Sequence, residues 1–224
     1  MIVAGLCQDG GMTTVTLTKH HHACVTLASG DTRILVDPGS LGEAPSIEGI
    51  DAILITHDHF DHVRPELIAQ ALAEGIPVWL PADAAGRLGL EGEGVHLAEH
   101  GDAFAVGSIK VSVLGDEHAP LHPTKAGPQN RAYLVDGRIL ITGDEHADAP
   151  GPVDVLITPA DAPWLRSVDL ISYIQRLTPR LVIGVHDGLV NEAGRKIATK
   201  NIAALTGEGA KEATIVAEGD SIEL

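Results

Sequence analysis

Short apolar runs alternate with turn-forming segments along most of this chain, which is typical of β-strands separated by loops. Residues 13–18 alternate between polar and apolar positions, residues 23–27 and 34–36 are apolar, and Ser29-Gly30-Asp31 predicts a hairpin turn. Further strands are predicted at residues 52–56, 77–80, 95–97, 103–106, 109–114, 131–135, 139–142, 153–157 and 181–185. Residues 215–222 predict a final strand or a hairpin.

Three segments have the spacing of apolar residues that predicts an amphipathic helix. The first, 65–74, opens with Pro65 and stops at Gly75, which are common residues at those two ends. The other two helices are predicted at about 163–177 and 189–205, each with an apolar face. Strands and helices therefore share the chain, and the fold class is α/β (α+β).

Two pairs of strand segments resemble each other across the chain. Asp31–Asp37 is similar to Asp136–Thr142, and Asp51–Thr56 is similar to Asp154–Thr158. Each half runs hairpin, strand, helix, strand, so two similar halves would pack sheet on sheet as a four-layer αββα sandwich; the alternative is a chance likeness of strand ends. We predict a single domain over 1–224, in which residues 1–11 are a short extra strand or an N-terminal extension ahead of Met12.

The composition of the chain says more about its possible partners than about its fold. The formal net charge is −16, from 15 Lys and Arg against 31 Asp and Glu, so phosphate backbones are repelled and nucleic acid is not expected as a partner. Two cysteines give no disulfide framework. We find no long apolar run and no signal peptide, so we expect a cytoplasmic protein with no membrane contact.

The richest chemistry lies in His57-Asp58-His59-Phe60-Asp61-His62, which puts three imidazoles and two carboxylates into six residues. This run follows the predicted strand 52–56 and precedes the predicted helix 65–74. His57 and His59 are two apart in extended chain and can point the same way. Asp61 and His62 come as the chain turns and can point to a second place nearby. The layout predicts two adjacent metal ions; the alternative is a polar loop with surface histidines.

Other ligand-type residues also follow apolar strands, often beside a glycine that lets the backbone approach closely. We predict one ion held by His57, His59 and His118, a second held by Asp61, His62 and His186, and Asp144 bridging them. Imidazoles with carboxylates suit zinc, with manganese or iron as alternatives. Asp61 could bind metal, accept a proton from the nucleophilic water, or do both.

This ordered set resembles the metallo-β-lactamase superfamily, in the H-x-H-x-D-H run at 57–62, the later His118, Gly143-Asp144 and His186. The likeness extends from about residue 13 to 224 and implies the αββα fold and a dinuclear hydrolase. Secreted zinc β-lactamases carry Cys where this chain has Asp144, and they carry a signal peptide. Both differences point away from antibiotic hydrolysis.

Two N-terminal segments resemble one branch of this superfamily in particular. His22-Ala23-Cys24-Val25 and Ile34-Leu35-Val36-Asp37-Pro38-Gly39 are similar to small cytoplasmic hydrolases related to ascorbate-6-phosphate lactonase. The third motif, Glu117-His118-Ala119-Pro120, differs from that of glyoxalase II enzymes, which disfavours thioester hydrolysis. No basic arm like that of tRNA 3′-processing endonucleases is visible.

Several residues have weaker claims on the site. His122 competes with His118 as a ligand. Asp37 could accept the second N–H of a metal-bound histidine or could be an ordinary turn residue. His22 could face the site. His146 could donate a proton to the leaving group as a catalytic residue, with a surface histidine as the alternative.

The predicted function is hydrolysis of a small lactone, ester or amide by metal-activated water. A phosphodiesterase of the same fold and a metal-binding sensor without turnover are the alternatives. Iron redox chemistry, as in flavodi-iron proteins, usually needs a flavin domain for which the chain has no length left. A small-molecule substrate is the expected partner, and a homo-oligomer is possible.

Overall fold

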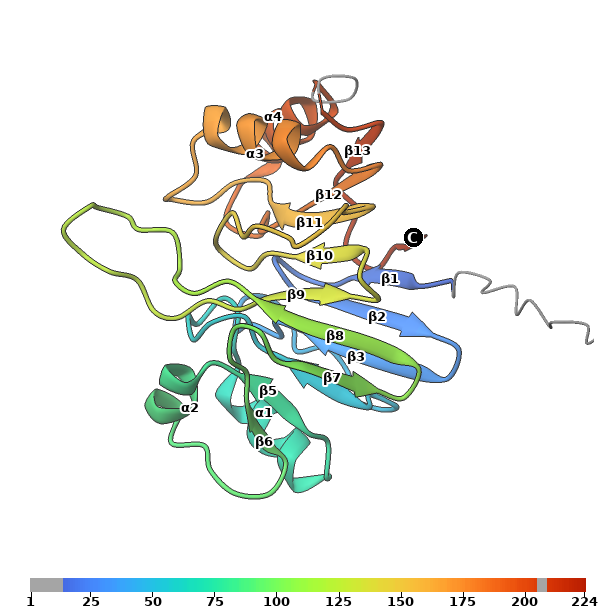
Figure 1. Cartoon of the computed structure of the whole chain (residues 1–224), viewed down its shortest axis with the longest axis vertical. Coiled ribbons are helices and arrows are strands. Elements are labelled where there is room, and N and C mark those ends of the chain that lie inside the picture. Colours follow the sequence, from blue (N-terminus) through green and yellow to red (C-terminus); the bar gives the residue numbers. More distant parts are fainter. Residues whose placement is uncertain (1–13, 205–208) are drawn as a thin grey trace, which may run out of the picture.

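Two seven-stranded sheets face each other at the centre of the computed structural model, which describes residues 14–204 and 209–224 (Figure 1). The first sheet has the order β14 (Ser221–Glu223), β1 (Thr16–Lys19), β2 (Val25–Ser29), β3 (Thr32–Val36), β4 (Ala52–Leu54), β5 (Val78–Leu80) and β6 (Val95–Leu97). The second has the order β13 (Glu212–Thr214), β12 (Leu181–Val185), β11 (Val155–Pro159), β10 (Ile139–Ile141), β9 (Ala132–Val135), β8 (Ile109–Leu114) and β7 (Ala103–Val106).

The two sheets are built alike. In the first, β1 to β3 pair antiparallel and β3 to β6 pair parallel; in the second, β7 to β10 pair antiparallel and β10 to β13 pair parallel. The segments that resemble each other in sequence take equivalent places, because β3 beside β4 corresponds to β10 beside β11. The sequence similarity between the two halves of the chain therefore corresponds to a similarity in their structures.

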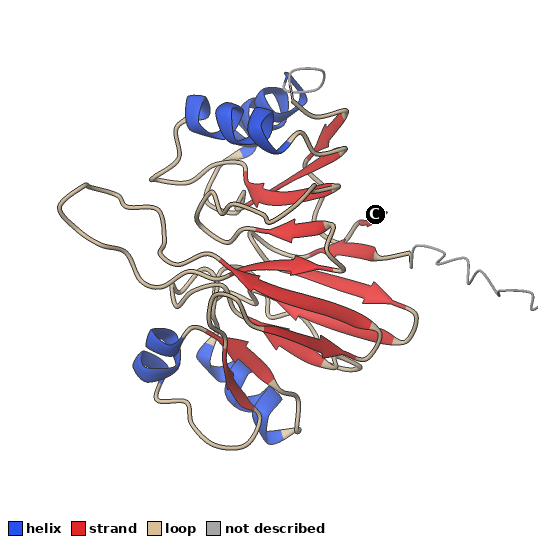
Figure 2. Ribbon diagram, in the orientation of Figure 1, coloured by secondary structure: helices blue, strands red, loops and turns tan. Residues whose placement is uncertain are grey.

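Helices cover the outer faces, so the predicted four-layer αββα sandwich is confirmed (Figure 2). Helices α1 (Pro65–Ala73) and α2 (Ala82–Leu88) lie on the first sheet, and α3 (Ser167–Leu177) and α4 (Glu192–Ala204) lie on the second. Helix α1 buries Leu67 and Ile68 against β4 and β5, and α3 buries Tyr173 and Ile174 against β11 and β12.

Aliphatic side chains fill the space between the sheets. Ile34 and Leu54 from the first sheet and Ile139 and Ile157 from the second are almost fully buried in one cluster. Burying each such side chain contributes about 1.5–3 kcal/mol, so this layer holds the two sheets, and the strand ends between them, in place. No helix among residues 14–204 and 209–224 is long and apolar enough to cross a membrane.

The elements differ from those predicted in three places. Helix α2 was not predicted, because its seven residues contain one glycine and are too few to show a period. Helix α3 begins at Ser167 rather than at 163, since residues 163–164 form a turn and residues 165–166 are not helical. The tail does not form one strand or hairpin: β13 extends the second sheet and β14 joins the first, so the chain crosses between sheets. The prediction for residues 1–11 lies outside the described residues.

Candidate metal centre

The predicted ligands follow strands whose carboxyl ends meet at one edge of the sandwich. His57 comes three residues after β4, Asp144 three after β10 and His186 directly after β12. Neighbouring parallel strands present their carboxyl ends together, so these loops converge. The structure brings together all seven predicted metal ligands in overlapping groups: His57, His59, Asp61, His62, His118, Asp144 and His186.

The first group consists of His57, His59 and His118. Their ring centroids lie 4.6 Å (His57 to His59), 4.6 Å (His59 to His118) and 4.9 Å (His57 to His118) apart. One ring nitrogen from each lies within 4.8 Å of the others, and His57 and His118 are buried while His59 is half-buried. Three imidazoles around one point are a set that zinc accepts.

The second group contains Asp61, His62 and His186, as predicted, and also His22. All four are buried, and their candidate ligand atoms lie within 4.8 Å of one another. The Oδ2 atom of Asp61 lies 3.4 Å from Nε2 of His186 and 3.2 Å from Nε2 of His22. His22 therefore faces the centre, which the sequence had left open.

Asp144 lies between the two groups. Its Oδ2 atom is 3.4 Å from Nε2 of His118, in the first group, and 3.4 Å from Nε2 of His186, in the second. Its Oδ1 atom is 3.4 Å from Nε2 of His62. A carboxylate in contact with both groups is placed as a bridging ligand would be, so the geometry agrees with that prediction.

A carboxylate and a hydroxyl orient two of the rings. Nδ1 of His62 donates to Oδ2 of Asp37 at 2.8 Å. The Thr56 hydroxyl also donates to Asp37 Oδ2, at 2.7 Å, and so can accept from Nδ1 of His57 at 3.0 Å. With the proton on Nδ1, each ring is left with an unprotonated Nε2, the form that binds metal. Asp37 thus holds a histidine, as one of its two predicted roles requires.

Backbone carbonyls orient two more rings. Nδ1 of His118 donates to the carbonyl of Ala119 at 2.6 Å, and Nδ1 of His186 donates to the carbonyl of Asp161 at 2.7 Å. A carbonyl can only accept, so these protons also sit on Nδ1. The four rings thus share one tautomer, with the proton on Nδ1 and with Nε2 toward the centre.

The buried polar atoms of the centre fit a metal ion. Among the described residues, Nε2 of His57, His62 and His186 and Oδ1 of Asp144 are buried with no hydrogen-bond partner. Leaving such atoms unpaired is costly, and each is of a type that ligates zinc. The donor set therefore fits one cation in each group.

The carboxylates and histidines of the centre shift each other's pKa values. Burial raises the pKa of Asp144, but its contacts with His62, His118 and His186 outweigh this and hold that pKa well below its usual range. Burial lowers the pKa of His186, but its contacts with Asp144 and Asp61 raise it to about 9. These carboxylates favour positive charge on the rings, and a divalent cation bound at Nε2 would supply that charge in place of a proton.

Several residues beside the metal centre have a strained backbone conformation. Among the described residues, five non-glycine positions have positive φ, and three of them border the centre: His22 at 58°, Asp37 at 48° and His186 at 64°. Such conformations cost free energy and persist where the surrounding contacts fix them, which is common at functional sites.

Other candidates lie outside the two groups. His122 is exposed and bonds Thr124, so His118 and not His122 joins the centre. His146 stacks on Tyr173 with ring centroids 4.5 Å apart, and its catalytic role stays a prediction. Asp58, inside the motif, forms an ion pair with the exposed side chain of Arg87.

Sequence reasoning missed two contributors. The indole Nε1 of Trp164 donates to Oδ2 of Asp144 at 2.9 Å, but a tryptophan in a predicted helix carries no signal of this role. Gly39 packs so closely that a Cβ there would lie 1.9 Å from the backbone oxygen of Asp61. The Asp37-Pro38-Gly39 turn beside the motif was the available clue.

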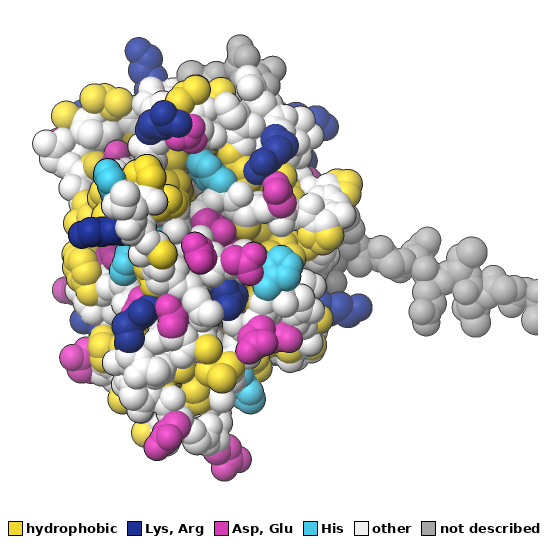
Figure 3. All heavy atoms as spheres, turned by 60° about the vertical axis from the view of Figure 1, so that its left-hand side comes forward, with side chains coloured by type: hydrophobic (Ala, Val, Ile, Leu, Met, Phe, Trp, Pro, Cys, Tyr) yellow, Lys and Arg dark blue, Asp and Glu magenta, His cyan; other side chains and the backbone are white. Residues whose placement is uncertain are grey.

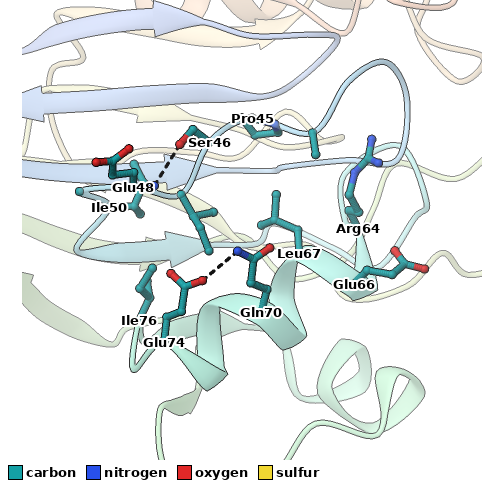
Figure 4. Close-up of a pocket in the computed structure, with 13 residues that line it drawn as sticks. Pro45, Ser46, Glu48, Ile50, Arg64, Glu66, Leu67, Gln70, Glu74 and Ile76 are labelled. Atoms are coloured by element: carbon teal, nitrogen blue, oxygen red, sulfur yellow. Dashed lines mark hydrogen bonds between the residues drawn. The ribbon is translucent and has the colours of Figure 1, made fainter.

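Two surface hollows have different relations to the centre. A cavity of about 720 Å³ is lined by His118 and Trp164 and by residues 119–121, and so borders it. Figure 3 shows acidic side chains near the middle of the face that this view brings forward, with histidine side chains around them. A second cavity, of about 810 Å³, lies between residues 44–50 and helix α1 and includes no predicted ligand (Figure 4).

Comparison with known proteins identifies the family. The family described as "Beta-lactamase superfamily domain" matches residues 16–186. Protein Rv0786c of Mycobacterium tuberculosis is 32% identical over 85% of this chain and 92% of its own length. A UPF0173 protein of Pyrococcus furiosus is 31% identical over 77% of this chain and 83% of its own length. A protein of Ruegeria sp. named "UPF0173 metal-dependent hydrolase" is 29% identical over 64% of each chain.

Solved structures show the same fold. Igni18, a metallo hydrolase of Ignicoccus hospitalis, matches with a TM-score of 0.69 at 14% identity, over 95% of this chain and 99% of its own. The metallo-β-lactamase fold protein YhfI of Bacillus subtilis matches with a TM-score of 0.64 at 17% identity, over 95% of this chain and 100% of its own. The chain therefore belongs to the β-lactamase superfamily and, within it, to the UPF0173 family.

Proposed function

From this family membership and the metal centre, we propose that the chain is a metal-dependent hydrolase with a two-metal, zinc-containing site that cleaves small lactones, esters or amides. The observation that carries the proposal is the pair of buried ligand groups joined at Asp144, with Nε2 atoms of matching polarity aimed inward. The relative of Ruegeria sp. named a metal-dependent hydrolase supports the same class of activity.

Two divalent cations in such a site supply an activated water at neutral pH and stabilise negative charge that develops on the substrate. The chain's own groups do the rest. Asp61 projects into the second group, where its carboxylate orients the attacking water and accepts its proton. Trp164 holds the bridging carboxylate through a 2.9 Å hydrogen bond.

The cavity beside the centre supports a small substrate. Its wall combines the Trp164 ring and Leu121 with the ligand His118, so an apolar body can rest there while a carbonyl reaches the metals. His146 lines the same cavity, where it would donate a proton to the leaving group. Residues 22–25 and 34–39 resemble hydrolases related to ascorbate-6-phosphate lactonase, and this resemblance supports testing lactones first.

A substrate screen tests the proposal. The zinc-loaded protein, its chelator-treated form and His59→Ala would be assayed on γ-lactones, p-nitrophenyl acetate and bis(p-nitrophenyl) phosphate. We expect zinc-dependent cleavage of a lactone or ester that His59→Ala reduces at least 100-fold. Cleavage of the phosphodiester alone would favour the phosphodiesterase alternative, and bound zinc without turnover on any probe would favour the sensor.

A further inference from the structure

The buried histidine His22 belongs to the second ligand group by distance, but its hydrogen bonds differ from those of the other rings. It lies in the turn between β1 and β2, where its ring centroid is 3.9 Å from that of His186. Its Nε2 atom is 3.2 Å from Oδ2 of Asp61. Distance alone would therefore make His22 a fourth ligand of this group.

The tautomer of the His22 ring argues against a role as a metal ligand. The backbone N–H of Gly188 points at Nδ1 of His22 with an N···N distance of 3.0 Å. A backbone N–H can only donate, so Nδ1 of His22 is the acceptor and carries no proton. A neutral imidazole then carries its proton on Nε2, the atom that faces Asp61. His57, His62, His118 and His186 have the opposite arrangement, with Nδ1 as the donor.

Close packing of the backbone at Gly188 against His22 keeps the ring in this tautomer. A Cβ at position 188 would lie 3.0 Å from Cβ of His22 and 2.7 Å from Nε2 of His21, so only glycine lets the backbone approach this closely. The backbone N–H of His186 also donates to the carbonyl of His22, at 3.2 Å. Two backbone contacts thus hold the 186–188 segment against the ring.

We infer that His22 is a positioning residue rather than a metal ligand, and that its Nε2–H holds Oδ2 of Asp61. This hydrogen bond fixes the rotation of the Asp61 carboxylate, on which both of that residue's proposed roles depend. A charge-assisted bond of this kind is stronger than a neutral one. The inference rests on the proposed two-metal site, because it assigns His22 a place in that site.

The direct test is histidine tautomer assignment by ¹⁵N NMR of the whole chain, with and without added zinc. We expect His22 to show a proton on Nε2 and none on Nδ1 in both samples. We expect His62, His118 and His186 to show protonated Nδ1 with zinc on Nε2. A zinc-coordinated Nε2 on His22 would overturn the inference.

Metal counting separates this inference from the proposed function. In both His22→Ala and His22→Gln a non-glycine residue still occupies position 22, where φ is positive, so the backbone strain is matched. The two variants differ because the Gln amide can still donate a hydrogen bond toward Asp61. We expect both to keep the zinc content of the wild type, with zinc affinity lowered about 10–100-fold in His22→Ala and largely restored in His22→Gln. His59→Ala, at a predicted ligand, should lose about one equivalent.

Cobalt(II) provides a spectroscopic readout of whether a metal ligand is lost. The cobalt protein of His22→Gln should keep the visible band positions of the wild type, because no ligand is lost. Loss of an equivalent in both His22 variants, with a changed cobalt spectrum, would show that His22 is a ligand and overturn the inference. A wild type that binds no zinc would instead refute the proposed function, and the tautomer of His22 could still be read.

Discussion

Replacing Asp37 by Asn tests how the centre is held together. Asp37 is buried and accepts three hydrogen bonds: from the backbone N–H of Thr56 at 2.8 Å, from its hydroxyl at 2.7 Å, and from Nδ1 of His62 at 2.8 Å. Asparagine has nearly the same shape but only one acceptor oxygen. In either orientation of the amide, at least one of these donors therefore faces an N–H group.

The expected cost has two parts. Loss of a partner that orients a metal-bound histidine weakens metal affinity about 10–100-fold, which corresponds to about 1.4–2.7 kcal/mol. The metal-free protein should also lose about 1–3 kcal/mol of folding stability, since a buried donor is left without an acceptor. The affinity loss should fall mainly on the second ligand group, because Asp37 contacts that group's His62 directly and reaches His57 of the first group only through the Thr56 hydroxyl.

The assay is competition for zinc against a chromogenic chelator, with urea unfolding of the metal-free protein in parallel. Asp51→Asn is the matched control: Asp51 accepts a backbone hydrogen bond from Arg33 at 2.7 Å, but it is exposed and precedes β4, whereas Asp37 lies at the opposite, carboxyl end of this strand pair. We expect one zinc to bind Asp37→Asn nearly as tightly as in the wild type and the other to bind more weakly. Wild-type affinity for both ions would refute the reasoning.

Three further predictions follow from single contacts. Trp164→Phe removes the hydrogen bond to Asp144, so we expect zinc affinity to fall about 10–100-fold in competition with a chromogenic chelator. Gly39→Ala, whose Cβ would meet the backbone of Asp61, should abolish tight zinc binding, whereas Gly151→Ala, with nothing within 4 Å, should bind zinc normally. Burial raises the pKa of the Cys24 thiol above its usual range, so the unfolded chain releases this proton first as pH rises. Stability contributed by the protonated thiol should therefore fall as pH rises above about 9, and Cys24→Ala should flatten that fall in unfolding experiments.

The architecture and the ligand set could be predicted because each leaves a local mark in the sequence. Apolar runs such as 52–56 and 181–185 mark buried strands, and parallel strands bring the residues after them to one edge. The run from His57 to His62 supplied most of the ligands in one turn. The similarity of the two halves predicted the paired sheets.

What could not be predicted depends on contacts between distant segments. The place of His22 is set by the backbone at Gly188, 166 positions away, and the pattern around His22 carries no trace of it. Trp164 lies ahead of α3, which begins later than its apolar spacing suggests, and it bonds Asp144, 20 positions away in the chain. The two final strands join different sheets, a choice made by the packing of the whole sandwich and not by their own three residues.

The central claim is that two buried ligand groups hold two metal ions. The most direct test is elemental analysis of the protein purified without added metal and after zinc titration, for the wild type and His59→Ala. The account predicts close to two equivalents of zinc or a similar divalent ion in the wild type and about one in the variant. No metal in the purified wild type, and none taken up on titration, would contradict it.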